Sequence, residues 1–345
     1  MTLQDWMDES RDRVAEHGVL TGARGSAEAL LTGVLDRVGR NGYNYGTSIF
    51  EREWDVLVVL DTCRPDLLAE MAQNYDYVPR DVPTHTSLGS ASIEWVKKNF
   101  TDDDYSKPTI DQTVNDNYED KLADTAYVTA NLFAEHIDEG ALLHLDEVHE
   151  YGWNDDDYTT PPEVVTERAV AAAREHDPEY LIVHYMQPHA PYRSMIDRYG
   201  WDEKPGIGNQ GATHPAREMW EELRAGAVSV EEVWNAYRDN LRWVMEDGVE
   251  PLLNNVDAET VVLSSDHGEV FGRWGLRKWT GSGQTGREWG TYAHPPYVPI
   301  RTLKEVPWVE TSATDSGALE VETEPPKSEV SESERQDRLE ALGYV

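Results

Sequence analysis

The residues best suited to chemistry are a carboxylate, an aspartate–histidine pair and two further histidines, each within or shortly after an apolar run. They are Asp61, Asp266 with His267, and His184 and His189. Carboxylates and imidazoles are the ligands that Zn²⁺, Mn²⁺, Mg²⁺ and Ca²⁺ take in proteins. An Asp and a His placed together at the end of a buried strand also cost desolvation energy unless a ligand binds them. These residue types indicate a site for a divalent metal or a phosphate-like anion.

The apolar runs before these residues predict the elements that position them. The predicted strands lie at 55–60, 127–129, 180–185 and 260–264, and the predicted helices at 163–175 and 218–246. Strands that alternate with helices predict an α/β fold, with a mostly parallel central sheet and helices on both faces. Ligands bind at the carboxyl ends of such strands, so the candidate residues should converge on one edge of the sheet.

The composition limits the kinds of partner. The chain has 345 residues, with 66 acidic and 30 basic side chains and a formal net charge of −36. Such a charge argues against nucleic acid or an anionic membrane surface as the main partner. Hydrophobic residues make up 39% of the chain, enough to pack a core, so this is not a disordered acidic tail. Acidity on this scale is typical of proteins adapted to high salt, where charge repulsion is screened.

The rest of the sequence indicates a location and a domain organisation. The single cysteine, Cys63, excludes an internal disulfide and a cysteine-rich zinc site. We see no membrane segment and no signal peptide, and expect a cytoplasmic protein. We expect a helical N-terminal extension over 1–50, a catalytic domain over 51–310, and an acidic linker with a short terminal helix over 311–345.

Four segments carry a resemblance to a known family. They are VVLDTCRPD at 58–66, QPHAPY at 187–192, SSDHGEVFG at 264–272 and YAHPPYVPIR at 292–301. Together they resemble motifs of the alkaline phosphatase/sulfatase superfamily, and the terminal RLEALGYV is similar to the endings of haloarchaeal sulfatase-like proteins. The resemblance implies an alkaline-phosphatase-like fold and one or two divalent ions of Mn, Zn, Mg or Ca.

The resemblance also implies roles for single residues. Asp61, Asp266 and His267 match the family's metal ligands, and His189 matches its substrate-binding or acid–base histidine. His294 matches a further ligand or anion contact. Two more residues are candidates for substrate binding. Lys278 precedes a Gly-rich segment that could cover a ligand, and Arg64 could pair with Asp61 or with substrate.

The identity of the nucleophile is left open by the sequence. Cys63 lacks the arginine of the formylglycine pattern, so we interpret it as a packed core residue. The segment SASIEW at 90–95 resembles the T-S-x-S-E-F pattern of the phosphoglycerol-transferase branch of this superfamily. This resemblance implies Ser90 as the nucleophile, at the start of a predicted helix over 93–99 whose dipole favours an anion. We prefer Ser90 as nucleophile and keep Ser92 and Ser87 as alternatives.

These observations predict a metal-dependent hydrolase that cleaves a phosphate or sulfate ester through a serine. The substrate would be an anionic small molecule or glycan ester. One alternative is a transferase that passes a phospho-group to a glycan or lipid headgroup. Another is a metal- or anion-binding protein of the same fold that has lost turnover.

Overall fold

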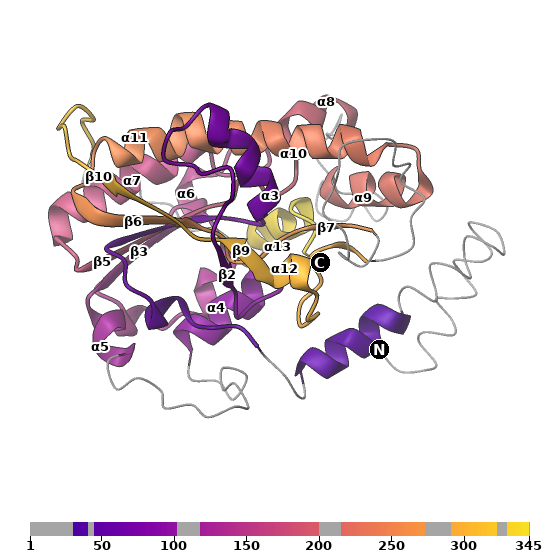
Figure 1. The fold of residues 1–345 in the computed structure, drawn as a ribbon, viewed down its shortest axis with the longest axis horizontal. Helices are drawn as coiled ribbons and strands as arrows, with labels where there is room; N and C mark the ends of the chain where they lie inside the picture. Colours follow the sequence, from indigo (N-terminus) through magenta and orange to yellow (C-terminus); the bar gives the residue numbers. More distant parts are fainter. Residues whose placement is uncertain are drawn as a thin grey trace.

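The computed structural model describes residues 30–40, 45–101, 118–199, 215–272, 291–322 and 330–344 (Figure 1). Its centre is a six-stranded sheet with the order β10-β6-β1-β5-β3-β4. The strands are β1 (Val56–Leu60), β3 (Thr125–Thr129), β4 (His144–Glu147), β5 (Tyr180–Tyr185), β6 (Ala258–Ser264) and β10 (Val309–Ala313). All neighbouring pairs are parallel except β10 with β6. The predicted mostly parallel α/β sheet is therefore confirmed.

Both faces of the sheet are buried. In β1, Val56, Val58 and Leu60 point to one apolar cluster, whereas Leu57 and Val59 point to the other. Successive side chains of a strand point to opposite faces, so an uninterrupted apolar run is expected of a strand that is covered twice. All five residues are at most 4% exposed.

Helices cover the two faces unequally. Figure 1 shows α7, α10 and α11 along one face and α4 with α5 on the other. Their bounds are α4 (Ser92–Phe100), α5 (Tyr118–Ala123), α7 (Pro162–His176), α10 (Val230–Val244) and α11 (Glu250–Leu253). A π-helical turn, Met245–Val249, joins α10 to α11. The helices predicted at 163–175 and 218–246 are confirmed, the second as α9 (Pro215–Ala225), α10 and this turn.

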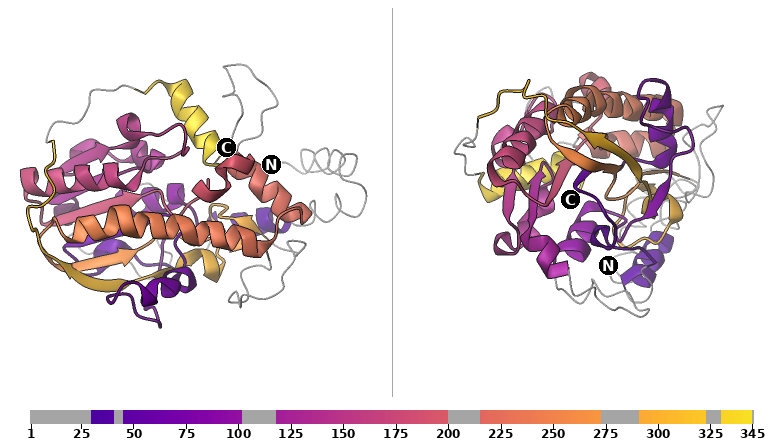
Figure 2. Two further views of the ribbon diagram at one scale, coloured as in Figure 1. Left: turned by 90° about the horizontal axis from the view of Figure 1, so that it is seen from above. Right: turned by 60° about the vertical axis from the view of Figure 1, so that its left-hand side comes forward.

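Shorter elements surround the carboxyl edge of the sheet. The small strands are β2 (Thr84–Thr86), β7 (Val270–Phe271), β8 (Tyr292–Ala293) and β9 (Glu305–Pro307), and the short helices are α3 (Pro65–Leu68), α6 (His149–Gly152), α8 (Ile196–Tyr199) and α12 (Arg301–Lys304). β2 pairs with β9 and β7 pairs with β8. The last described helix, α13 (Glu332–Ala341), lies at one end of the sheet, drawn in yellow in Figure 2.

Two further features concern the predicted boundaries and the membrane. Residues 30–40 are helical, and Ile49 and Phe50 belong to the core. A boundary between the catalytic domain and an acidic linker was predicted at residue 310. β10 crosses this position and pairs with β6 of the central sheet. None of the helices in the described ranges is long and apolar enough to cross a membrane.

Candidate active site

The strand register brings Asp61 and Asp266 together. Val59 of β1 is opposite Ser264 of β6 and opposite His184 of β5. Asp61 lies two residues after Val59, and Asp266 lies two residues after Ser264. Because Val59 and Ser264 are paired, both carboxylates lie at the same height at the carboxyl end of the sheet. The predicted convergence of distant residues on one edge follows directly from this register.

The turn after β1 holds the carboxylates in place. Thr62 has a φ of 64°, a left-handed conformation that is strained for a β-branched residue and costs about 1–3 kcal/mol. In this conformation its backbone N–H donates to Asp266 Oδ1 at 3.2 Å, and Tyr237 Oη donates to its carbonyl. The strain is located at the junction of the two carboxylates.

Asp61, His184 and Asp266 form what we call the metal cluster. One ligand atom from each lies within 4.8 Å of the others, and each of the three side chains is 0% exposed. Asp61 Oδ1, Asp266 Oδ2 and His184 Nε2 have no hydrogen-bond partner among the described residues. Buried polar atoms are normally paired, so three unpaired ones that face each other fit a bound cation.

The charges of the metal cluster support the same conclusion. Burial raises the pKa of Asp61, and the neighbouring Asp266 carboxylate raises it further. Burial also opposes ionisation of Asp266, but His267 and His184 outweigh it and lower the pKa of that carboxyl. Two buried carboxylates this close repel each other unless a positive charge lies between them. The donor set therefore suits a divalent metal.

Neighbouring residues orient the metal cluster. Asn131, which follows β3, donates from Nδ2 to Asp61 Oδ2 at 2.9 Å. His184 Nδ1 lies 2.7 Å from Tyr127 Oη, which leaves Nε2 facing the carboxylates. A partner on the far nitrogen of a ligating histidine fixes its ring and tautomer.

Ser92 is the hydroxyl that reaches the metal cluster. It donates from Oγ to Asp61 Oδ2 at 3.2 Å and lies 3.1 Å from His267 Nε2. His267 Nδ1 donates to the Gly268 carbonyl at 2.9 Å, so in the neutral ring Nε2 is the nitrogen that can accept a proton or bind a metal. Ser92 is also the first residue of α4, where the helix dipole favours negative charge.

His267 borders the metal cluster and is held by a tight backbone contact. Its Nε2 lies 3.2 Å from Asp266 Oδ2 and 3.7 Å from Asp61 Oδ1. A Cβ on Gly268 would lie 2.1 Å from the Thr302 carbonyl oxygen, so only glycine fits there. The glycine of the Asp-His-Gly-Glu segment thus has a packing role that places the histidine before it.

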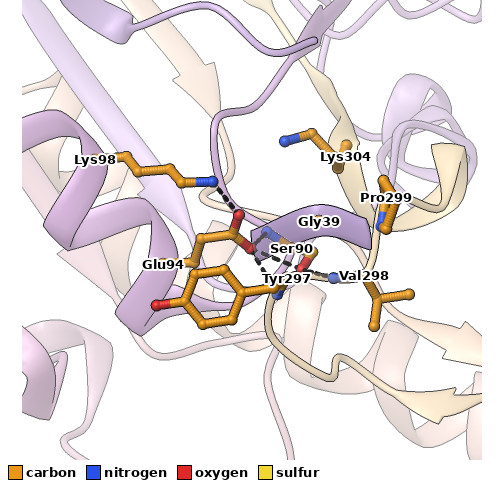
Figure 3. Close-up of a pocket in the computed structure, with 8 residues that line it drawn as sticks. All are labelled: Gly39, Ser90, Glu94, Lys98, Tyr297, Val298, Pro299 and Lys304. Atoms are coloured by element: carbon orange, nitrogen blue, oxygen red, sulfur yellow. Dashed lines mark hydrogen bonds and ion pairs between the residues drawn. The ribbon is translucent and has the colours of Figure 1, made fainter. Parts of the chain in front are cut away.

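The structure places Ser90 away from the metal cluster. Its Oγ lies 2.8 Å from Glu94 Oε2 and 3.1 Å from the Pro295 carbonyl, and it accepts from the Val298 N–H (Figure 3). Ser87 Oγ donates to the Asp266 backbone carbonyl, not to its carboxylate. Of the three serines considered, Ser92 alone directs its hydroxyl at Asp61 and His267.

His189 and His294 form a second layer beside the metal cluster. Their Nε2 atoms are 3.3 Å apart, and His294 Nδ1 lies 3.2 Å from a Glu269 carboxylate oxygen. Burial followed by the charge of His294 lowers the pKa of His189. Burial opposes protonation of His294, but Glu269 outweighs it and raises the pKa of that ring. This pattern makes His294 the cation that donates to a neutral His189.

The remaining predicted residues have other surroundings. Arg64 pairs with Asp66, at 2.8 and 2.7 Å, and not with Asp61. Cys63 is a free, fully buried thiol in the core, as expected of a packed residue. Lys278 and the Gly-rich segment after it lie outside the described residues.

Tyr344 was not a candidate from the sequence. It follows α13, and its Oη lies 3.1 Å from Ser92 Oγ. Its ring is stacked on His189, with the centroids 5.1 Å apart. His184 was among the candidate residues but was not assigned as a ligand, because a histidine in an apolar strand resembles a core residue. Asn131 carries no motif and was not a candidate.

Comparisons with known proteins give structural similarity only. No family model matches the sequence, and no curated protein matches it. The soluble domain of lipooligosaccharide phosphoethanolamine transferase A from Neisseria meningitidis has a TM-score of 0.46 at 17% identity, over 75% of this chain and 76% of that one. BT1596, a 2-O GAG sulfatase, has a TM-score of 0.41 at 13% identity, over 74% and 63%. The C-terminal periplasmic domain of EcEptC from Escherichia coli, in complex with Zn, has a TM-score of 0.40 at 14% identity, over 80% and 78%.

Proposed function

We propose that this protein is a metal-dependent enzyme that displaces the alcohol of a phosphate or sulfate ester through Ser92. The observation that carries the proposal is the position of the Ser92 hydroxyl, 3.2 Å from a carboxylate of the metal cluster and 3.1 Å from the free nitrogen of His267. A nucleophilic hydroxyl needs a group that accepts its proton, and both neighbours can do so.

The metal cluster would hold the cation that the chemistry requires. Asp61, His184 and Asp266 are the residues we assign to it, with His267 beside them. When bound, a divalent ion would neutralise the oxygens of the transferred group and polarise its central atom. Ser92 would then attack in line, forming a seryl ester as the leaving alcohol takes up a proton.

His294 and His189 are the residues we assign to the transferred group. Glu269 favours the protonated form of His294, so a positive charge lies next to His189 within the site. Peripheral oxygens gain negative charge in the transition state of phosphoryl or sulfuryl transfer, and a fixed cation there lowers the barrier. This local charge offsets the acidity of the rest of the chain.

In a second step the group bound to Ser92 passes to an acceptor, and the identity of that acceptor distinguishes a hydrolase from a transferase. Water would release Ser92 and give inorganic phosphate or sulfate, whereas an acceptor alcohol would take the group intact. The arrangement of Ser92, His267 and the metal cluster serves both reactions. The acceptor is therefore assigned by experiment.

The test compares two serines that are two positions apart. The purified protein is assayed in molar KCl with nitrophenyl phosphate, bis-nitrophenyl phosphate and nitrophenyl sulfate, with Mn²⁺, Zn²⁺, Mg²⁺ or Ca²⁺, and with and without glycerol as acceptor. Ser92→Ala should lower kcat by about 10³-fold or more, because it removes the nucleophile. Ser90→Ala is the matched control and should keep kcat, since its hydroxyl bonds to Glu94 and Pro295. Full activity in Ser92→Ala would overturn the assignment.

A further inference from the structure

The segment 330–344 reaches into the candidate active site. The helix α13 lies at one end of the sheet (Figure 2), and the chain after it brings Tyr344 Oη to 3.1 Å from Ser92 Oγ. The Tyr344 ring is stacked on His189 and meets the rings of His294 and Phe133 edge-on, at 5.5 and 4.8 Å between centroids. The site is thus covered by residues of the same chain.

The surroundings of Ser92 Oγ leave one direction for an incoming group, and Tyr344 occupies it. Besides its bond to Cβ, the oxygen has three tetrahedral directions. Asp61 Oδ2 lies at 3.2 Å, His267 Nε2 at 3.1 Å and Tyr344 Oη at 3.1 Å. The first two belong to the side of the metal cluster. Attack requires the phosphorus or sulfur atom at about 3–3.5 Å from the nucleophile, the distance at which the Tyr344 hydroxyl now lies.

The contacts that hold this segment are mostly polar and near the surface. Arg335 donates to the Leu132 carbonyl at 2.5 Å and lies 2.9 Å from a Glu135 carboxylate oxygen. Arg338 donates to the His149 carbonyl and lies over the Trp153 ring. The ion pair of Arg335 with Glu135 contributes little and weakens further in salt.

The apolar contacts of the segment are confined to its last residues. Ala341 and Leu342 are each 2% exposed, and Leu339 and Tyr344 pack against the core, whereas the rest of α13 is exposed or half-buried. Stability varies across a structure, and elements with few buried apolar contacts open at the lowest free energy. The segment contributes no strand to the central sheet, so its departure would break none of the strand pairs.

From these contacts we propose that residues 330–344 form a removable cap that competes with the transferred group for the space at Ser92. The proposal rests on the function proposed above, with Ser92 as nucleophile. Tyr344 holds the place of the phosphoryl or sulfuryl group while the site is idle. Entry of substrate displaces Tyr344, and release of product lets it return.

The test measures whether a ligand and the cap exclude each other. Inorganic phosphate is titrated by calorimetry into the full chain with Mn²⁺, and amide exchange of α13 is followed with and without phosphate. We expect phosphate to speed amide exchange in α13. Tyr344→Ala should bind phosphate about 10-fold more tightly, because the competing conformation is lost. Tyr344→Phe keeps the stacked ring and should show a smaller gain.

A second variant tests the anchors without touching the site. Arg335→Ala combined with Arg338→Ala should also tighten phosphate binding, since it loosens the segment outside the pocket. Slower or unchanged exchange of α13 on phosphate binding, or weaker binding by Tyr344→Ala, would overturn the cap and make Tyr344 a ligand contact. If no variant binds phosphate with metal present, the proposed function fails and the cap fails with it.

Discussion

Two buried polar clusters lie on either side of the start of α4, and they differ in how their charges are compensated. The metal cluster contains two carboxylates and one imidazole, with three atoms that lack a partner. The second group, which we call the lysine cluster, consists of Glu94, Lys98 and Lys304. Both groups are buried, yet the metal cluster leaves polar atoms without partners, whereas the lysine cluster pairs its charges within the chain.

The lysine cluster is paired within the chain. Glu94 accepts from Lys98 Nζ and from the backbone N–H groups of Ser90 and Tyr297, the latter two at 2.8 and 2.9 Å (Figure 3). Lys304 Nζ donates to the Leu88 carbonyl at 2.8 Å. Satisfied buried groups give structure, whereas unsatisfied ones that converge indicate a ligand. The comparison therefore distinguishes Ser92, whose hydroxyl contacts the metal cluster, from Ser90, whose hydroxyl contacts Glu94 of the lysine cluster.

The largest expected effect comes from removing a carboxylate of the metal cluster. Asp266→Asn keeps an oxygen that can accept from Thr62 and His267, but removes one of the two negative charges. We expect calorimetry to show loss of Mn²⁺ binding and kcat to fall by about 10³-fold or more. In chelator the free energy of unfolding should rise by about 1–2 kcal/mol, because the repulsion between the carboxylates is gone. Lower stability of the metal-free variant would contradict this account.

An intermediate effect is expected from breaking the lysine cluster. Glu94 is buried, with 3% of its surface exposed, and Lys98 is its ion-pair partner. Lys98→Met removes that partner and leaves the carboxylate buried. The free energy of unfolding should fall by about 3 kcal/mol, as measured in urea. Mn²⁺ affinity should not change, because Lys98 does not contact the metal cluster. A large loss of metal binding with unchanged stability would show that the two clusters are not independent.

The smallest effect is expected at Lys304, the second cation of the lysine cluster. Burial lowers the pKa of Lys304 to about 7, against the attraction of Glu94. The unfolded chain holds this proton up to about pH 10.4, so Lys304 makes stability rise with pH from about 7 to 10. Lys304→Met should therefore stabilise the protein at pH 6, where the buried lysine would be protonated, and the gain should shrink steadily as the pH rises toward 10. Thermal unfolding at both pH values measures it, and a gain that is the same at both would contradict the assignment.

The fold was predictable because its strands are local patterns. The runs at 55–60, 180–185 and 260–264 are apolar without alternation, as strands buried on both faces must be, and each became a strand of the central sheet. Asp61 comes one residue after the first of these runs and Asp266 two residues after the last, so their place at the carboxyl edge was also predictable. The role of His184 as a ligand was not predictable in this way, since a strand pattern does not show whether a polar side chain within the strand faces a ligand or the core.

The choice between Ser90 and Ser92 could not be made from the sequence. The predicted helix began at residue 93, and the structure begins α4 at Ser92. A change of one residue at a helix start redirects the side chains around it, because residues two apart in a helix do not face the same way. Asn131 and Tyr344 were missed for another reason, because each reaches the site through contacts that have no fixed spacing in the chain.

Local order and residue type thus determined the sheet, its edge and the carboxylates that meet there. Whether a segment forms a strand, and which residue follows it, depends on neighbours along the chain. Both can therefore be predicted from the sequence. The tertiary structure alone decided that His184 completes the metal cluster, that Ser92 faces it, and that Tyr344 covers it. These are matters of direction and proximity between segments up to 252 residues apart, as for Ser92 and Tyr344, and only packing sets them.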